Sequence, residues 1–152
     1  VPAHIINGGD TIKDYSISTY IGTAVKVSNK TYGDINKINQ RIDGIIFETK
    51  WYKYYDKPNI FYGSKRPVVP SELVDISLTL NIKFFGCDLP SVDKSGSLDK
   101  PVHNALLGSK IIIYESLANL NCLPELEIFK FIGFPLNLQD LDGSPVRAVG
   151  II

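Results

Sequence analysis

The stretch PVHNALLGSKIIIYESLANL, residues 101–120, is the most informative segment of this chain. Its first part can open a short helix, because proline suits the first helical turn and a glycine such as Gly108 suits the end of a helix. The β-branched run at residues 111–114 that follows is typical of a buried strand. The segment therefore predicts a helix that leads into a strand, with Glu115 at the end of that strand.

The other patterns predict more strands than helices. We expect further strands at residues 15–20, 23–27, 45–47, 82–87, 127–134 and 146–152. A helix is expected to start at Ser71, whose hydroxyl can cap the free backbone amides. Because at least one helix crosses over between strands, the pattern indicates an α/β or α+β fold with a mixed or barrel-like sheet.

Length and charge narrow the class of protein. A chain of 152 residues fits one domain, and its 16 basic and 16 acidic residues cancel. We therefore expect no nucleic-acid partner and no anionic membrane surface as partner. No apolar run approaches the ~20 residues that span a bilayer. Cys87 and Cys122 lack metal-ribbon spacing, and we expect free thiols in a cytoplasmic protein.

Several motifs together resemble one enzyme family. His103 stands twelve residues before Glu115, and the sequence continues with Leu117 and Asn119-Leu120. The segments GCDLPSVD at 86–93 and DGSPVRAVGII at 142–152 fit the same pattern. The set resembles the cyclase family, metal-dependent hydrolases that include bacterial kynurenine formamidase, over about residues 15–152.

The resemblance implies a fold and an assembly. The fold is the α/β cyclase type, a single domain over residues 1–152 with a β-rich, mixed or barrel-like sheet and a few outer helices. Members commonly form dimers or larger oligomers, so a homo-oligomer, dimer or tetramer, is expected. The aromatic loop at residues 50–62 would be buried in that contact, because large apolar patches seldom stay bare.

The resemblance also implies site residues. His103 and Glu115 match a family histidine and glutamate that hold metal, so they are the candidate catalytic residues and the only candidate metal ligands. Two ligands are fewer than the three or four that zinc takes. We therefore expect no cofactor, or one weakly bound divalent zinc or manganese ion.

The other family ligands lie on a motif that reads His-x-Gly-Thr-His-x-Asp-x-Pro-x-His. Alternate residues of a strand face one side, so such ligands can converge on an ion. With Gly22-Thr23 placed on the motif's Gly-Thr, its ligand positions are occupied by Tyr20, Ala24, Lys26 and Lys30. In this register the metal ligands are lost. His4 is expected to be a partly exposed terminal residue rather than a ligand.

Lys26 then suggests a substitute for the metal. Its ammonium could pair with Glu115, which would make Lys26 the third candidate catalytic residue. The alternative is that Lys26 points to solvent, as most lysines do. Tyr20, Lys30, Asp88 and Trp51 are expected to line the pocket. Asp88 and Asp93 could instead tie down loops through hydrogen bonds.

Two functions follow. The first is a divergent or non-catalytic scaffold, a pseudoenzyme that keeps a small-molecule pocket. The alternative is an active hydrolase or cyclase on an amide (formamide) or lactone bond, using His103 and Glu115 with one metal or none. In the metal-free version His103 is the general base, and Lys26 or Lys30 stabilises the oxyanion.

Overall fold

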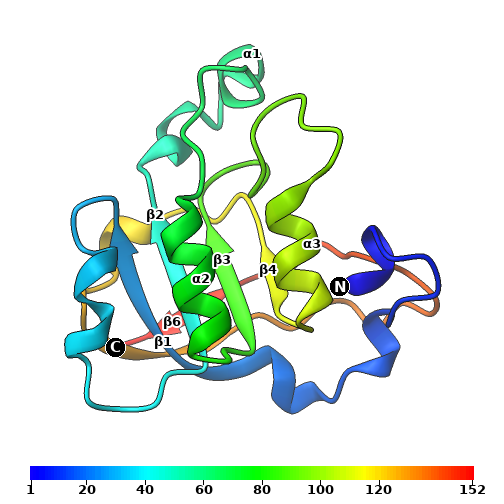
Figure 1. Ribbon diagram of the computed structural model, residues 1–152, viewed down its shortest axis with the longest axis horizontal. Helices are drawn as coiled ribbons and strands as arrows, with labels where there is room; N and C mark the ends of the chain where they lie inside the picture. The colour runs from blue at the N-terminus through cyan, green and yellow to red at the C-terminus, as the bar shows by residue number, and fades with distance from the viewer.

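A six-stranded mixed sheet organises the computed structural model, which describes residues 1–152 (Figure 1). Its strand order is β4-β3-β2-β1-β5-β6. The strands are β1 Ile21–Ser28, β2 Gly44–Glu48, β3 Phe84–Cys87, β4 Ile112–Tyr114, β5 Ile128–Ile132 and β6 Val149–Ile151. Neighbours among β1 to β4 run parallel, whereas β5 is antiparallel to β1 and β6 to β5. The α/β class is confirmed, and the sheet is open, with β4 and β6 as its two edges.

Three α-helices accompany the sheet: the single turn α1 Pro58–Phe61, then α2 Ser71–Thr79 and α3 Pro101–Gly108. α2 and α3 lie side by side over one face of the sheet, and α1 projects beyond it (Figure 1). Six short 3-10 helices occupy Pro2–His4, Ile12–Asp14, Ile17–Tyr20, Tyr32–Lys37, Trp51–Tyr54 and Leu120–Cys122. None of the helices has the length and apolar character needed to cross a membrane.

Both faces of the sheet are covered by apolar side chains. Val25 and Val27 of β1 face the larger core with Leu73 of α2 and Leu106 of α3. The alternate position Ala24 faces a second core on the other side, as the period of two in a strand requires. The second core also contains Tyr20, Ile46, Phe84, Tyr114, Leu117, Phe129 and Phe131. The parallel strands are thus buried on both faces, which explains their nearly continuous apolar runs.

Gly44 is required where β2 begins. A Cβ atom at this position would lie 1.9 Å from a ring carbon of Phe84. The two residues are register partners on β2 and β3, so only a residue without a side chain lets the ring lie across the strand.

Two local predictions are wrong. Residues 15–20 do not form a strand: Ser16 accepts a hydrogen bond from the Ser18 amide at 3.4 Å, and a 3-10 helix follows at Ile17–Tyr20. Such short side-chain bonds compete with strand pairing. Ser71 does not cap α2, because Pro70 occupies the cap position and the Ser71 hydroxyl bonds the Glu72 carboxylate at 3.3 Å.

The parallel strands bring polar residues to one edge of the sheet. Glu48 ends β2, Asp88 directly follows β3, and Glu115 directly follows β4. Carboxyl ends of parallel strands share an edge, which is where α/β proteins commonly bind ligands.

Candidate functional site

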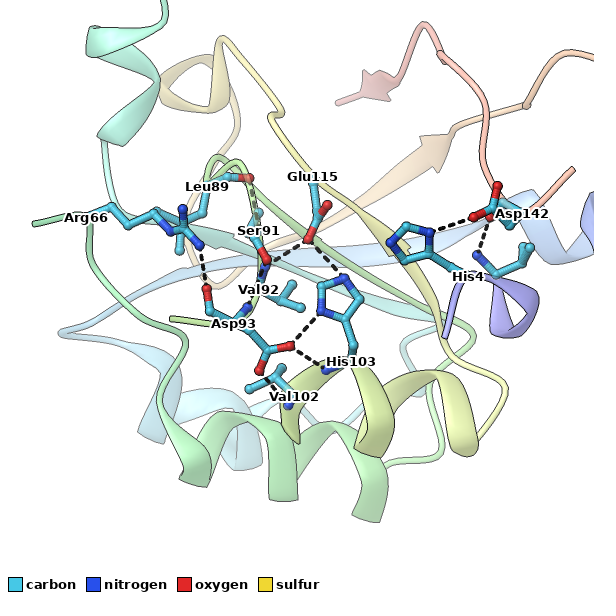
Figure 2. A network of polar contacts seen from close by, with 12 residues as sticks. His4, Arg66, Leu89, Ser91, Val92, Asp93, Val102, His103, Glu115 and Asp142 are labelled. Carbon is cyan, nitrogen blue, oxygen red and sulfur yellow. Dashed lines mark hydrogen bonds and ion pairs between the residues drawn. The ribbon is translucent and has the colours of Figure 1, made fainter. Parts of the chain in front are cut away.

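His103 joins two carboxylates in a short chain of polar contacts (Figure 2). Its Nδ1 lies 2.7 Å from Oδ2 of Asp93, and its Nε2 lies 3.4 Å from Oε1 of Glu115. Asp93 belongs to the loop after β3, His103 to the first turn of α3, and Glu115 to the end of β4. Three consecutive segments of the fold therefore meet at one buried imidazole.

Asp93 fixes the orientation of that imidazole. Its carboxylate accepts the backbone N–H groups of Val102 at 2.8 Å and His103 at 3.2 Å, which have no carbonyl partner in the first turn of a helix. The Arg66 guanidinium anchors the Asp93 carbonyl at 2.8 Å. Because a carboxylate accepts hydrogen bonds, Nδ1–H of His103 donates to Asp93 and Nε2 faces Glu115.

Glu115 is held in a largely desolvated position. Its side chain is 29% exposed, and Oε1 accepts the Val92 amide at 2.8 Å. Burial raises the pKa of Glu115, while the Val92 N–H and the charge of His103 lower it by smaller amounts. A carboxyl group with a raised pKa beside an imidazole is well suited to proton exchange.

A cavity of about 480 Å³ opens beside Glu115, between the end of β4 and the chain before β6. Its wall includes Tyr20 and Tyr114, whose hydroxyls donate to the carbonyls of Ile12 at 3.1 Å and Gly133 at 2.8 Å. Burial raises the pKa of both tyrosines, so these phenols shape the cavity and stay protonated. Within the Asp93–His103–Glu115 chain, Glu115 is the member that lines this space.

His4 lies next to this chain of contacts. Its ring centroid is 5.7 Å from that of His103, and its Nδ1 lies 2.7 Å from Oδ2 of Asp142 (Figure 2). This contact is the first cause of the lowered pKa of Asp142. The His4 side chain is 47% exposed, as a terminal residue would be, yet it borders the site. No local pattern reveals this, because His4 and Asp142 stand at opposite ends of the chain.

Lys26 is not a partner of Glu115, so that prediction is wrong. Its Nζ lies 3.3 Å from Oε2 of Glu48 and donates to the carbonyl of Leu120 at 3.3 Å, with both charged side chains buried. The sheet order gives the reason. β2, which carries Glu48, is the direct neighbour of β1, whereas Glu115 follows β4 on the far side of β3.

The remaining candidates lie in different places. Tyr20 shares the cavity of Glu115, whereas Lys30 lines a separate polar cavity with Lys26. Asp88 is buried and accepts the amides of Thr49 at 2.9 Å and Trp51 at 2.6 Å, so it ties down a loop. Burial raises the pKa of Asp88. The Trp51 indole donates to the Phe61 carbonyl at 3.0 Å, and Trp51 lines neither cavity.

His103 and Glu115 fit two positions around a divalent ion. Two ligands on a tetrahedral zinc ion, each with a bond of about 2.0 Å, lie about 3.3 Å apart. The observed separation of Nε2 and Oε1 is 3.4 Å. No group of three or more His, Cys, Asp or Glu side chains is arranged to hold a metal, so these residues alone give an incomplete ligand set.

Comparisons with known proteins show the family and the fold. No family model matches the sequence. The chain is 32% identical to the kynurenine formamidase of Bacillus mycoides (strain KBAB4) over 154 residues, which is 97% of this chain and 71% of the relative. The kynurenine formamidase of Bacillus anthracis is 30% identical, with the same shares covered.

Solved structures share the fold. Isatin hydrolase A from Labrenzia aggregata, bound to benzyl benzoate, superposes with a TM-score of 0.82 at 20% identity, covering 99% of this chain and 70% of that chain. A potential metal-dependent hydrolase with cyclase activity gives a TM-score of 0.75 at 20% identity, covering 98% and 74%. With 32% identity to curated relatives over nearly its whole length, the chain belongs to the kynurenine formamidase family of cyclase-type hydrolases.

Proposed function

We propose that this protein hydrolyses the C–N bond of an amide, with aryl formamides as the first substrate class. The observation that carries the proposal is the chain from Asp93 through His103 to Glu115, which ends at a cavity of about 480 Å³. Pockets of this size suit small molecules. The bond type is taken from the names of the relatives: those similar in sequence are kynurenine formamidases, and those similar in fold include isatin hydrolases.

In this proposal the chain's own residues move the proton. Ionised Glu115 accepts a proton from a water molecule as the water oxygen bonds to the carbonyl carbon, and His103, oriented by Asp93, shares that proton until it passes to the amide nitrogen as the C–N bond breaks. A divalent ion, when bound to His103 and Glu115, would occupy these proton-carrying atoms and would instead supply polarisation of the carbonyl and activation of water. Because burial raises the pKa of Glu115, the protonated carboxyl is a weaker acid than an exposed glutamic acid and its carboxylate a stronger base.

A different register of the family motif supports the active hydrolase over the scaffold. Pro2-Ala3-His4 satisfies the final Pro-x-His of the motif, and it brings His4 to within 5.7 Å of His103, ring centroid to ring centroid. The residues at positions 20, 24, 26 and 30 then carry no information about lost ligands. One observation still favours the non-catalytic scaffold: no third His, Cys, Asp or Glu side chain is arranged with His103 and Glu115 to hold a metal.

The test is hydrolysis of N-formylkynurenine, with isatin as a cyclic amide for comparison. Activity is measured after chelation and again after addition of zinc or manganese. We expect His103→Ala and Glu115→Gln to lower kcat/KM by about 10²- to 10⁴-fold. Glu72→Gln, at an exposed carboxylate on α2, is the matched control. A folded protein that hydrolyses neither substrate under any metal condition would establish the scaffold instead.

We also propose a cytoplasmic homo-oligomer, a dimer or tetramer. Tyr55, Ile60 and Tyr62 are 60%, 44% and 64% exposed around α1, which projects from the sheet (Figure 1). Such aromatic surface is typical of subunit contacts. The buried free thiol of Cys87 agrees with a reducing compartment. Sedimentation of wild type and of Tyr62→Lys tests the contact: the variant should be smaller, and a wild-type monomer would contradict it.

A further inference from the structure

A second cavity, of about 570 Å³, lies at the carboxyl ends of β1 and β2. Its charged lining residues are Lys26, Lys30, Glu48, Lys50 and Glu125, and no apolar residue lines it. It shares no lining residue with the cavity beside Glu115. Ligand pockets are usually mostly apolar, so a wall of this kind suits only a small and strongly polar ligand.

The deepest charged group of this cavity has an unused oxygen. Oε2 of Glu48 lies 3.3 Å from Nζ of Lys26, but Oε1 is buried and has no hydrogen-bond partner. Tyr52 is the nearest candidate donor, because its pKa is raised first by burial and then by the charge of Glu48 and a hydrogen-bonding contact with it, yet no donor meets hydrogen-bond geometry at Oε1 itself. A buried carboxylate oxygen without a donor is costly, so Oε1 marks a place where a ligand N–H or O–H would be stabilised.

The lining carries more positive than negative charge. Lys30 and Lys50 are exposed, and neither forms an ion pair, whereas Lys26 is occupied by Glu48. Glu125 accepts the Thr31 hydroxyl at 2.6 Å, and its pKa is lowered by hydroxyl hydrogen bonds first and by the nearby lysines second. Three lysines against two glutamates leave one positive charge in excess, which favours an anion.

We propose that this cavity binds a small carboxylate that also carries a hydrogen-bond donor, that is, an α-amino or α-hydroxy acid. The carboxylate pairs with Lys30 and Lys50 at the rim, and the amino or hydroxyl group donates to Oε1 of Glu48 at the floor. This site is separate from the hydrolase site and would give the protein a binding function independent of amide hydrolysis.

The experiment is titration with L-alanine, L-lactate and propionate, followed by the backbone amide NMR shifts around the cavity. The three acids have the same carbon chain and differ only in an amino group, a hydroxyl group or neither. We expect L-alanine or L-lactate to bind about tenfold more tightly than propionate, since a hydrogen bond to a charged group is worth at least that factor. The tighter of the two identifies the donor. Equal binding of propionate, binding of inorganic phosphate alone, or no binding by any probe would overturn the proposal.

Variants place the binding in this cavity. Lys30→Ala with Lys50→Asn removes two exposed charges, and asparagine tolerates the left-handed backbone at position 50 (φ 63°), so the fold is retained and binding should weaken about tenfold or more. Lys94→Ala, another exposed lysine outside the cavity, should leave binding unchanged. Glu48→Gln replaces the charged acceptor by a weaker neutral one and should reduce the preference for the acid that carries the donor. Full affinity in the double lysine variant would overturn the assignment even if Glu48→Gln fails to fold.

Discussion

Asp93→Ala is the substitution that most directly tests how the site is built. The Asp93 carboxylate accepts three hydrogen bonds, from the amides of Val102 and His103 and from the His103 imidazole, at 2.8, 3.2 and 2.7 Å. Alanine removes all three acceptors and leaves a buried imidazole N–H without a partner. The variant should therefore lose both protein stability and the orientation of His103.

The size of the effect follows from those contacts. Loss of an oxygen that caps a helix costs about 1 kcal/mol. Loss of a charge-assisted bond to a buried group costs about 2 kcal/mol. The free energy of unfolding should thus fall by about 3 kcal/mol, which lowers Tm by about 9 °C in a domain of this size.

Urea and thermal unfolding followed by circular dichroism measure this loss. Asp99→Ala is the matched control in the same loop, because Asp99 is exposed and uses only its backbone carbonyl, toward Asn104. The control should lie within about 0.5 kcal/mol of wild type. A loss below about 1 kcal/mol for Asp93→Ala would refute the dual role of this carboxylate.

Three further predictions concern charge and packing. Burial raises the pKa of Glu115 in the folded state, so folding is progressively penalised as pH rises from 4.5 to that raised pKa, and Glu115→Gln should gain stability relative to wild type as pH rises above 4.5. Lys26→Met leaves Glu48 buried and unpaired, which should cost about 3–5 kcal/mol, and adding Glu48→Leu should recover most of it. Gly44→Ala forces a Cβ into the Phe84 ring and should cost about 3 kcal/mol.

A different result would contradict each of these three predictions. A stability difference between Glu115→Gln and wild type that does not change with pH would mean that this carboxyl titrates normally when folded. A double variant at positions 26 and 48 no more stable than Lys26→Met would show that the penalty does not come from the unpaired glutamate. Normal urea unfolding of Gly44→Ala would mean that β2 and β3 shift apart at little cost.

Most of the sheet was predictable because its signals are local. The β-branched runs of β1, β2 and β4 are buried on both faces, and the segment at 101–120 does form a helix followed by a strand. The strand prediction for residues 15–20 was wrong because alternating polar and apolar residues and strand-forming side chains also occur in this turn, which the Ser16 side chain stabilises. Sequence periodicity records burial, and it does not record whether a neighbouring strand is available for pairing.

The site was predictable only where its parts follow in close order. His103 and Glu115 lie on consecutive elements, so a motif links them, and the structure places them 3.4 Å apart. The partner of Lys26 depended on strand order, which spacing alone does not reveal. His4 is held at the border of the site by its contact with Asp142, and no local sequence pattern links residues at opposite ends of a chain.

The position of β1 inside the sheet has a consequence for how the chain folds. On one side β1 pairs with β2, which follows it closely, and on the other it pairs with β5, from Ile21 opposite Ile132 to Val25 opposite Ile128. During synthesis this apolar strand therefore keeps one open edge until about a hundred further residues have been made. Folding intermediates should be most prone to aggregate along that edge, and ribosome-bound chains that end before β5 should not acquire native protection in β1.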